Sequence, residues 1–103
     1  MSILSITFHT IESQLNNWDH FTKNELETII DTLPVEKYIL SEVETEMLTE
    51  GKNTNLLLVF ENSKKRMEFS ETELPNIAEK IAAQFGDTVM IFKTELNPLK
   101  QKN

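Results

Sequence analysis

The strongest constraint on the fold lies near the end of the chain, where a helix pattern passes directly into a strand pattern. Apolar residues recur every three or four positions from Ile77 to Phe85, Gly86 is placed to end the helix, and residues 89–96 read as a strand. A similar order of strand, helix and strand precedes this unit. Together the two units predict one small sheet with two helices packed on the same side.

The first predicted strand covers residues 3–11, where apolar and polar side chains alternate. This period of two is typical of a strand with one buried face. The apolar face consists of Leu4, Ile6 and Phe8. The opposite face carries Ser5, Thr7 and His9.

Apolar residues at helical spacing from Leu15 to Leu33 predict the first helix, which Pro34 ends. Trp18 lies on the same apolar stripe, which favours packing in the core over a role in ligand binding. The start of this helix has three interpretations, because several polar residues are suited to cap it. It begins near Asn17, begins near Thr22, or contains a break.

Two strands are predicted in the middle of the chain. Residues 38–48 alternate and place Glu42, Glu44 and Glu46 on one face, which is typical of an edge strand because exposed charge discourages unwanted pairing. Residues 55–61 are apolar at consecutive positions, which predicts a central strand covered on both faces.

The connections around these strands also carry signals. Residues 50–53 predict a hairpin, because Gly51 and Asn53 adopt positive φ at low cost. Residues 62–66 are polar and predict a solvated turn. Residues 70–73 read as a capping box, from which the second helix is expected to begin.

The predicted order is strand, helix, strand, strand, helix, strand. With crossovers of the usual hand, it gives an α+β, ferredoxin-like fold in which both helices cover one face of a four-stranded antiparallel sheet. The third and fourth strands are apolar on both faces, so we expect a second copy of the chain to cover the open face in a homodimer. The residues expected at this interface are Leu58, Val89 and Ile91.

Length and composition exclude several classes of protein. The chain has 103 residues, enough for one domain, and we expect residues 97–103 to form a flexible tail. It has no cysteine, which excludes disulfides and thiolate metal sites. No basic leader and no apolar stretch of the roughly 18 residues of a membrane span are found, so we expect a cytoplasmic protein without a membrane partner. A formal net charge of −7 argues against nucleic acid as a partner.

Few residues are candidates for chemistry. His9 and His20 are the only histidines and lack the spacing of a metal site, so we predict no metal. No glycine-rich phosphate loop or serine elbow is found, and no cofactor is expected. His9 is the one candidate catalytic residue: on the open face, oriented by Glu42 or Glu44, it would act as a general acid or base, although a surface or interface histidine is the commoner role. The candidate ligand-binding residues are Ser5, Thr7 and His9.

Four short features carry a family resemblance. They are Trp18 in the first helix and residues 57–63, 84–87 and 92–96, which include the sequences Phe-Gly-Asp and Phe-Lys-Thr. This set resembles the uncharacterised bacterial family catalogued as domain of unknown function 4286, over nearly the whole chain. The resemblance implies a ferredoxin-like fold of the dimeric α/β-barrel type and supplies no activity. The chain departs from the family pattern in its first helix, where residues 26–28 replace a common His-Ile-Pro segment, and it has Leu33-Pro34 where a glycine is common.

Two classes of function remain open. The first, which we favour, is a non-catalytic domain that dimerises through its sheet and binds a partner or a small ligand. It is motivated by the strands that are apolar on both faces and by the few reactive residues. The second is a cofactor-independent enzyme, similar to dimeric barrel monooxygenases or isomerases, in which His9 transfers protons in a cavity between subunits. Only the analogy of fold supports this second class.

Overall fold

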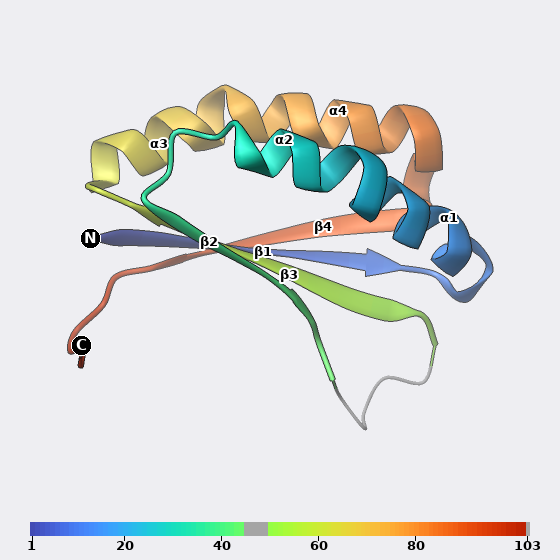
Figure 1. The fold of residues 1–103 in the computed structure, drawn as a ribbon, viewed down its shortest axis with the longest axis horizontal. Helices are drawn as coiled ribbons and strands as arrows, with labels where there is room; N and C mark the ends of the chain where they lie inside the picture. Colours follow the sequence, from blue (N-terminus) through green and yellow to red (C-terminus); the bar gives the residue numbers. More distant parts are fainter. Residues whose placement is uncertain (45–49, 103) are drawn as a thin grey trace.

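A computed structural model describes residues 1–44 and 50–102 as one four-stranded sheet with its helices on a single side (Figure 1). The strands are β1 (Ser2–Thr10), β2 (Lys37–Glu42), β3 (Lys52–Phe60) and β4 (Val89–Leu96). Their order across the sheet is β2-β3-β1-β4, and every neighbouring pair is antiparallel. This is the ferredoxin-like, α+β arrangement that the sequence predicts. β2 is an edge strand and β3 a central one, as expected.

The first helical segment starts earlier than expected. One turn of 3₁₀ helix (Glu12–Gln14) leads into α1 (Leu15–Phe21), and a π-helical turn (Thr22–Leu26) joins α1 to α2 (Glu27–Asp31). α1 begins at Leu15, two residues before Asn17, and no side chain caps it, so the predicted late start near Thr22 is wrong. The predicted break is confirmed, because the helix changes its hydrogen-bonding pattern at Thr22.

The second helical segment also begins early, which corrects two predictions. α3 (Ser63–Glu71) occupies the stretch predicted as a solvated turn, because the Asn62 side chain caps it by accepting a hydrogen bond of 2.9 Å from the backbone N–H of Lys65. Ser70 lies within α3 and does not start a helix. α4 (Glu73–Phe85) follows after a break at Thr72 and carries the predicted apolar stripe.

The predicted hairpin at residues 50–53 is wrong in part. Lys52 and Asn53 belong to β3, and of the expected turn residues Gly51 alone has a positive φ, of 81°. Part of the strand predicted over 38–48 lies outside the described residues, and its described part ends at Glu42. Gly51 lies so close to the end of β1 that a Cβ atom there would be 2.2 Å from the carbonyl oxygen of Thr10.

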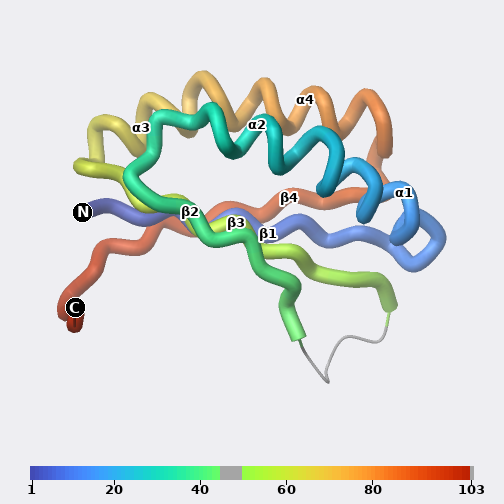
Figure 2. The backbone as a smooth tube through the Cα atoms, viewed as in Figure 1, coloured from blue at the N-terminus to red at the C-terminus, as the bar shows by residue number. Residues whose placement is uncertain are grey.

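The core lies between the sheet and the helices. These two layers are seen in the backbone trace (Figure 2). Trp18 is 1% exposed, and its ring stacks against Phe21 and contacts Phe8 and Phe85. Its indole Nε1 donates a hydrogen bond of 3.1 Å to Thr54 Oγ1, so the polar end of the ring is satisfied. The predicted core role of Trp18 is confirmed. None of the helices among the described residues is long and apolar enough to cross a membrane.

Candidate functional site

One face of the sheet carries no helix, and the strand register tells which side chains it presents. Cross-strand partners point to the same face. Three rows of cross-strand partners run across β3, β1 and β4 on this face. In the first row, Ser5 pairs with Leu57 and Thr94. The second row joins Thr7 to Asn55 and Phe92. The third row joins His9 to Asn53 and Met90.

The middle of this open face is polar. The Asn55 amide donates from Nδ2 to Ser5 Oγ at 2.9 Å and to Thr7 Oγ1 at 3.2 Å. Each hydroxyl keeps its own proton for a further acceptor, and the Asn55 oxygen is a further acceptor group. The three side chains therefore form a small hydrogen-bonding surface with donors and acceptors but no charge.

His9 lies beside this surface and is held by one strand neighbour. Its Nδ1 is 2.7 Å from Asn53 Oδ1, and because that oxygen accepts only, the imidazole proton of this bond sits on Nδ1. In the neutral ring, Nε2 is then the nitrogen that can accept a proton. The ring also lies close to Gly51, since a Cβ there would be 3.3 Å from His9 Cε1.

Large apolar side chains surround the polar centre. Ile39 on β2 is 43% exposed, and on β4 Met90 is 47%, Phe92 55% and Leu96 41% exposed. Leu57 pairs with Ile39 and is half-buried on the same face. Burying such side chains is favourable by roughly 25 cal/mol per Å² of apolar surface, so this face has a strong tendency to be covered.

The structure brings together three predicted site residues and separates three others. Ser5, Thr7 and His9 share the open face, as expected. Leu58, Val89 and Ile91 were assigned to this face, and that assignment is wrong: Leu58 and Val89 are buried in the core, and Ile91 packs against it. Both faces of β3 and β4 carry apolar residues, so composition did not distinguish them.

Sequence reasoning missed Asn53 and Asn55, which organise the polar centre, because Asn53 was read as a turn residue. It also missed Met90 and Phe92 as open-face residues. The predicted orientation of His9 by Glu42 or Glu44 is wrong, since Glu42 Oε1 lies 3.4 Å from Lys52 Nζ and Asn53 takes the role of partner. The alternation of β1 was the available signal, because it fixes which residues of the paired strands lie beside His9.

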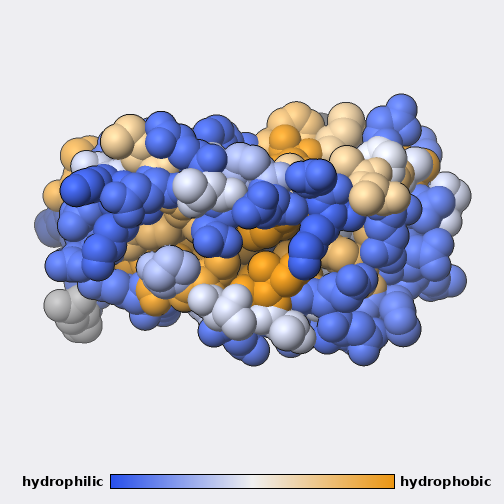
Figure 3. Space-filling model, turned by 90° about the horizontal axis from the view of Figure 1, so that it is seen from above, coloured by the Kyte–Doolittle hydropathy of each residue, from blue (hydrophilic) through white to orange (hydrophobic). Residues whose placement is uncertain are grey.

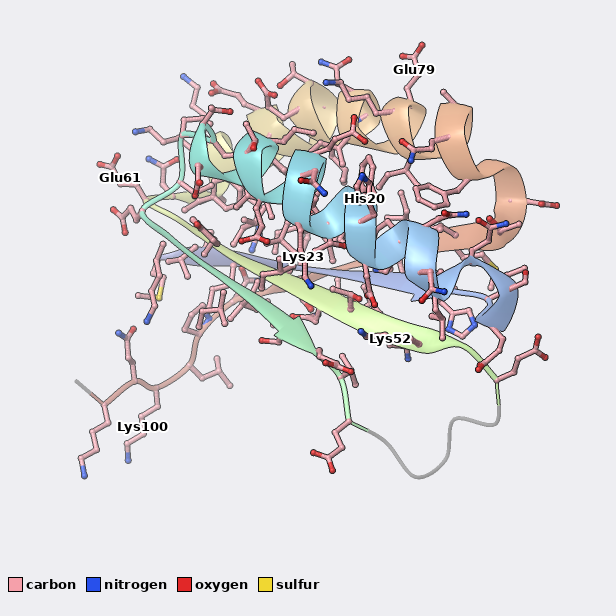
Figure 4. All side chains as sticks on the ribbon, turned by 45° about the vertical axis from the view of Figure 1, so that its right-hand side comes forward. His20, Lys23, Lys52, Glu61, Glu79 and Lys100 are labelled. Atoms are coloured by element: carbon pink, nitrogen blue, oxygen red, sulfur yellow. The ribbon has the colours of Figure 1, made fainter. Side chains whose placement is uncertain are left out.

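The remaining histidine is remote from this site. His20 is exposed on α1, and Asn24 donates to its backbone oxygen at 2.8 Å. Figure 4 shows it on the helical side of the sheet. Within residues 1–44 and 50–102, no group of three or more His, Cys, Asp or Glu side chains is arranged to hold a metal ion.

A separate cavity lies in a groove between α2 and α4. Its volume is about 570 Å³, and hydrophobic atoms are visible between hydrophilic rows on this helical side (Figure 3). Ile29, Ile77 and Ala83 contribute its apolar lining, and Glu73 and Glu79 also line it. Thr32, Asn76 and Lys80 complete its lining.

Comparison with known proteins identifies a family and a fold. Residues 1–99 match the family described as domain of unknown function DUF4286. No curated protein matches the chain. Among solved structures, an ethyl tert-butyl ether D (EthD) family protein from Bacillus halodurans superposes with a TM-score of 0.68 at 12% identity, covering 94% of this chain and 100% of that chain.

Two further structures extend the comparison. A protein from Deinococcus radiodurans, described as a candidate antibiotic biosynthesis monooxygenase, has a TM-score of 0.67 at 14% identity and covers 100% of this chain and 97% of its own. A dimeric ferredoxin-like protein from an uncultured marine organism has a TM-score of 0.51 at 10% identity, covering 98% of each chain. At these identities the likeness extends to the fold alone.

Proposed function

We propose that the chain, which belongs to the DUF4286 family of unknown function, is a homodimeric binding domain. Two copies pack through their open sheet faces, and a small ligand or a partner group binds at the polar centre between them. The observation that carries this proposal is the ring of exposed Ile39, Met90, Phe92 and Leu96 around that centre. Monomers seldom leave a large contiguous apolar patch in water.

The charge distribution supports a second copy as the occupant of this face. The chain has a formal net charge of −7, so two copies repel each other over most of their surfaces. In the paired rows of β1 to β4, however, Lys37 is the single charged side chain that shares a face with Ser5, Thr7 and His9. When two copies meet through this face, the paired rows therefore contribute no carboxylates that would repel each other.

The size of the face also suits a dimer. Four strands about 4.8 Å apart and eight residues of about 3.3 Å each give a projected area on the order of 500 Å². Because side chains project from the sheet, the accessible area of the face is larger than its projected area. It approaches the roughly 800 Å² per partner of a standard protein interface. A structural neighbour of the same fold is described as dimeric, which agrees with this assembly.

Light scattering on a sizing column tests the proposal. Over a dilution series, the wild type is expected to have twice the 11.9 kDa mass of one chain. Phe92→Glu places a charge on the open face and is expected to give the monomer mass. Met67→Glu is the matched control, because Met67 is 54% exposed but lies on α3, and it is expected to stay dimeric. A monomeric wild type, or a Phe92→Glu variant that remains dimeric, would overturn the proposal.

A second candidate function has one observation in its favour, the contact between His9 and Asn53. A histidine with Nδ1 bonded and Nε2 available is suited to accept a proton from a substrate, as in general base catalysis. Two structural neighbours are described as an EthD family protein and a candidate monooxygenase, which makes a cofactor-independent enzyme the alternative.

The crystal structure of the dimer separates the two functions. An enzyme requires a cavity of at least about 300 Å³ between the copies, with Ser5, Thr7 and His9 in its wall. An interface filled by side chains, with no such cavity, would count against the enzyme and leave the non-catalytic dimer in place.

A further inference from the structure

The groove between α2 and α4 lies on the opposite side of the sheet from the open face (Figure 1). Its floor is apolar: Ile77 is 3% exposed, Ile29 is half-buried, and Ala83 continues the apolar surface toward the end of α4. Ile77 is the one buried residue of the eight that line the groove, so the groove is shallow and opens to solvent along its length. An apolar strip of this shape suits a partner that needs only one of its faces covered.

The groove is about as long as three turns of a helix. On α4 its lining runs from Glu73 to Ala83, and this stretch of helix spans about 15 Å. A partner helix laid along the groove would place side chains at positions i, i+3 or i+4, and i+7 against the floor. This is the spacing with which amphipathic helices bind in grooves.

The walls of the groove favour a helix over an extended peptide as the partner. Both walls are α-helices, whose backbone N–H and C=O groups bond to each other, so neither wall offers a strand edge for pairing. The hydroxyl of Thr32 is also in use, because it donates a hydrogen bond of 2.8 Å to the backbone oxygen of Ile29. A bound helix satisfies its own backbone and requires only apolar contact from the floor.

The charged side chains at the groove are unpaired. In the part of the chain that the structure describes, no ion pair and no side-chain hydrogen bond involves Glu73, Glu79 or Lys80. Other surface charges are paired, as Lys65 Nζ is with Glu61 Oε2 at 2.7 Å. Figure 4 shows Glu79 projecting from α4 away from the sheet, so its carboxylate stands at the rim of the groove. The rim therefore has charges available to a partner.

The sign of the charges selects the partner. α2 and α4 together carry four acidic residues and one basic residue, Lys80. The whole chain has a formal net charge of −7. An acidic partner, including a second copy of this chain, is therefore repelled from the groove. A partner that carries lysine or arginine beside its apolar face is attracted to it.

We propose that this groove binds a basic amphipathic α-helix of a partner protein. The apolar face of that helix packs on Ile29, Ile77 and Ala83, and its cationic residues lie beside Glu73 and Glu79. A groove about 15 Å long and a helix about 10 Å wide give a contact below the roughly 1,200 Å² of stable interfaces, so the complex is transient. The groove and the open face lie on opposite sides of the sheet, so binding does not depend on whether the chain dimerises.

A designed peptide tests the proposal. It has about 14 residues, near the length at which an isolated helix is marginally stable, with leucine along one face, lysine along the other and blocked ends. The fluorescence anisotropy of the labelled peptide measures its binding to the 103-residue chain, and we expect saturable binding with a Kd of roughly 10 µM.

Two control peptides separate the apolar face from the charge. A scrambled peptide of the same composition keeps the positive charge but has no continuous apolar face. A peptide with glutamate in place of lysine keeps the apolar face but reverses the charge. Both are expected to bind at least roughly tenfold more weakly than the leucine–lysine peptide.

Two neighbouring alanines provide matched variants of the protein. Ala82 and Ala83 are both exposed on α4, and of the two Ala83 alone lines the groove. Arginine is a good helix former, so both arginine variants are expected to fold. Ala83→Arg obstructs the groove and is expected to weaken peptide binding roughly tenfold. Ala82→Arg adds the same charge outside the groove and is expected to change binding by less than about twofold.

A second pair of variants tests the rim charge. Glu79→Gln removes one carboxylate from the rim and is expected to weaken binding about threefold, which corresponds to a surface ion pair. Glu71→Gln is the control, because Glu71 is an exposed carboxylate on α3 that does not line the groove. It is expected to bind the peptide as the wild type does.

Several results would overturn the proposal. They are the absence of saturable binding, equal binding of the leucine–lysine peptide and either control peptide, and equal binding by Ala83→Arg and Ala82→Arg. An Ala83→Arg variant that is monomeric in light scattering, when the wild type is dimeric, would also overturn it, because a second copy would then occupy the groove. Loss of the open-face dimer in Phe92→Glu is expected to leave peptide binding unchanged, so the two proposals fail independently.

Discussion

Arg66 donates a hydrogen bond of 3.2 Å from Nη1 to the backbone oxygen of Leu96, which links α3 to the end of the edge strand β4. The same nitrogen lies 3.1 Å from the backbone oxygen of Ile3 and 3.0 Å from Asn97 Oδ1. Arg66 is buried: the residue is 6% exposed and its side chain 8%. One side chain thus holds α3 against both β1 and β4, and β4 carries the open-face residue Phe92.

We expect Arg66→Met to destabilise the fold by about 1–3 kcal/mol, because two backbone oxygens lose a charged donor. Urea unfolding followed by the fluorescence of Trp18 measures this change. Lys64→Met is the control, since Lys64 is exposed on the same helix and its replacement should change the free energy of unfolding by no more than about 0.5 kcal/mol. Equal effects of the two substitutions would mean that the contacts of Arg66 contribute little.

The two glycines provide a matched test of backbone strain and steric contact. Gly51 and Gly86 both have positive φ, of 81° and 61°. A Cβ at Gly51 meets the carbonyl oxygen of Thr10, whereas a Cβ at Gly86 has no neighbour within 4 Å. We expect Gly51→Ala to cost clearly more than Gly86→Ala, which should lose about 1–2 kcal/mol from strain alone. Thermal unfolding of both variants measures the difference, and a larger loss at Gly86 would contradict the geometry.

Tyr38 is expected to titrate above its ordinary range. Its hydroxyl donates a hydrogen bond of 2.5 Å to Asp31 Oδ1, which favours the neutral phenol and raises the pKa of Tyr38. Because the pKa is raised in the folded state, the stabilisation is complete below the pKa of the unfolded chain and is lost as the pH rises through the folded value. Tyr38 is the single tyrosine, so the ultraviolet absorbance of tyrosinate reports on it alone.

Two variants separate the causes of this shift. Asp31→Asn removes the carboxylate and is expected to lower the pKa of Tyr38 toward its ordinary value. Glu27→Gln removes the smallest of the charge effects and is expected to lower the pKa by less. An Asp31→Asn variant that titrates as the wild type does would show that the hydrogen bond is absent in solution.

The sequence predicted the arrangement of elements better than the faces of the strands. The alternation of residues 3–11 was enough to place Ser5, Thr7 and His9 together, because one face of β1 is apolar and the other polar. In β3 and β4 both faces carry apolar residues, and the side that faces the helices is decided by pairing with β1, which is a tertiary contact. Leu58 and Val89 were misplaced for this reason.

The helix boundaries were predicted wrongly for a related reason. Asn62 caps α3, but the charged residues that follow it hid the apolar pattern of a helix. One of them, Arg66, is buried through a contact with Ile3, which is distant in the sequence. The π-helical turn at Thr22 has no local signature in the sequence beyond the competing capping signals.

The contact between His9 and Asn53 makes a prediction about the protonation of the ring. In water a neutral imidazole favours the proton on Nε2, but the bond from Nδ1 to Asn53 Oδ1 selects the other tautomer. Nitrogen chemical shifts of the two rings measure this directly, and we expect His9 to carry its proton on Nδ1 in the wild type. Asn53→Leu removes the acceptor and is expected to return the proton to Nε2. His20, which lies on α1 away from this contact, should keep its shifts in the variant. A wild-type His9 with its proton on Nε2 would remove the basis for assigning His9 the role of a base.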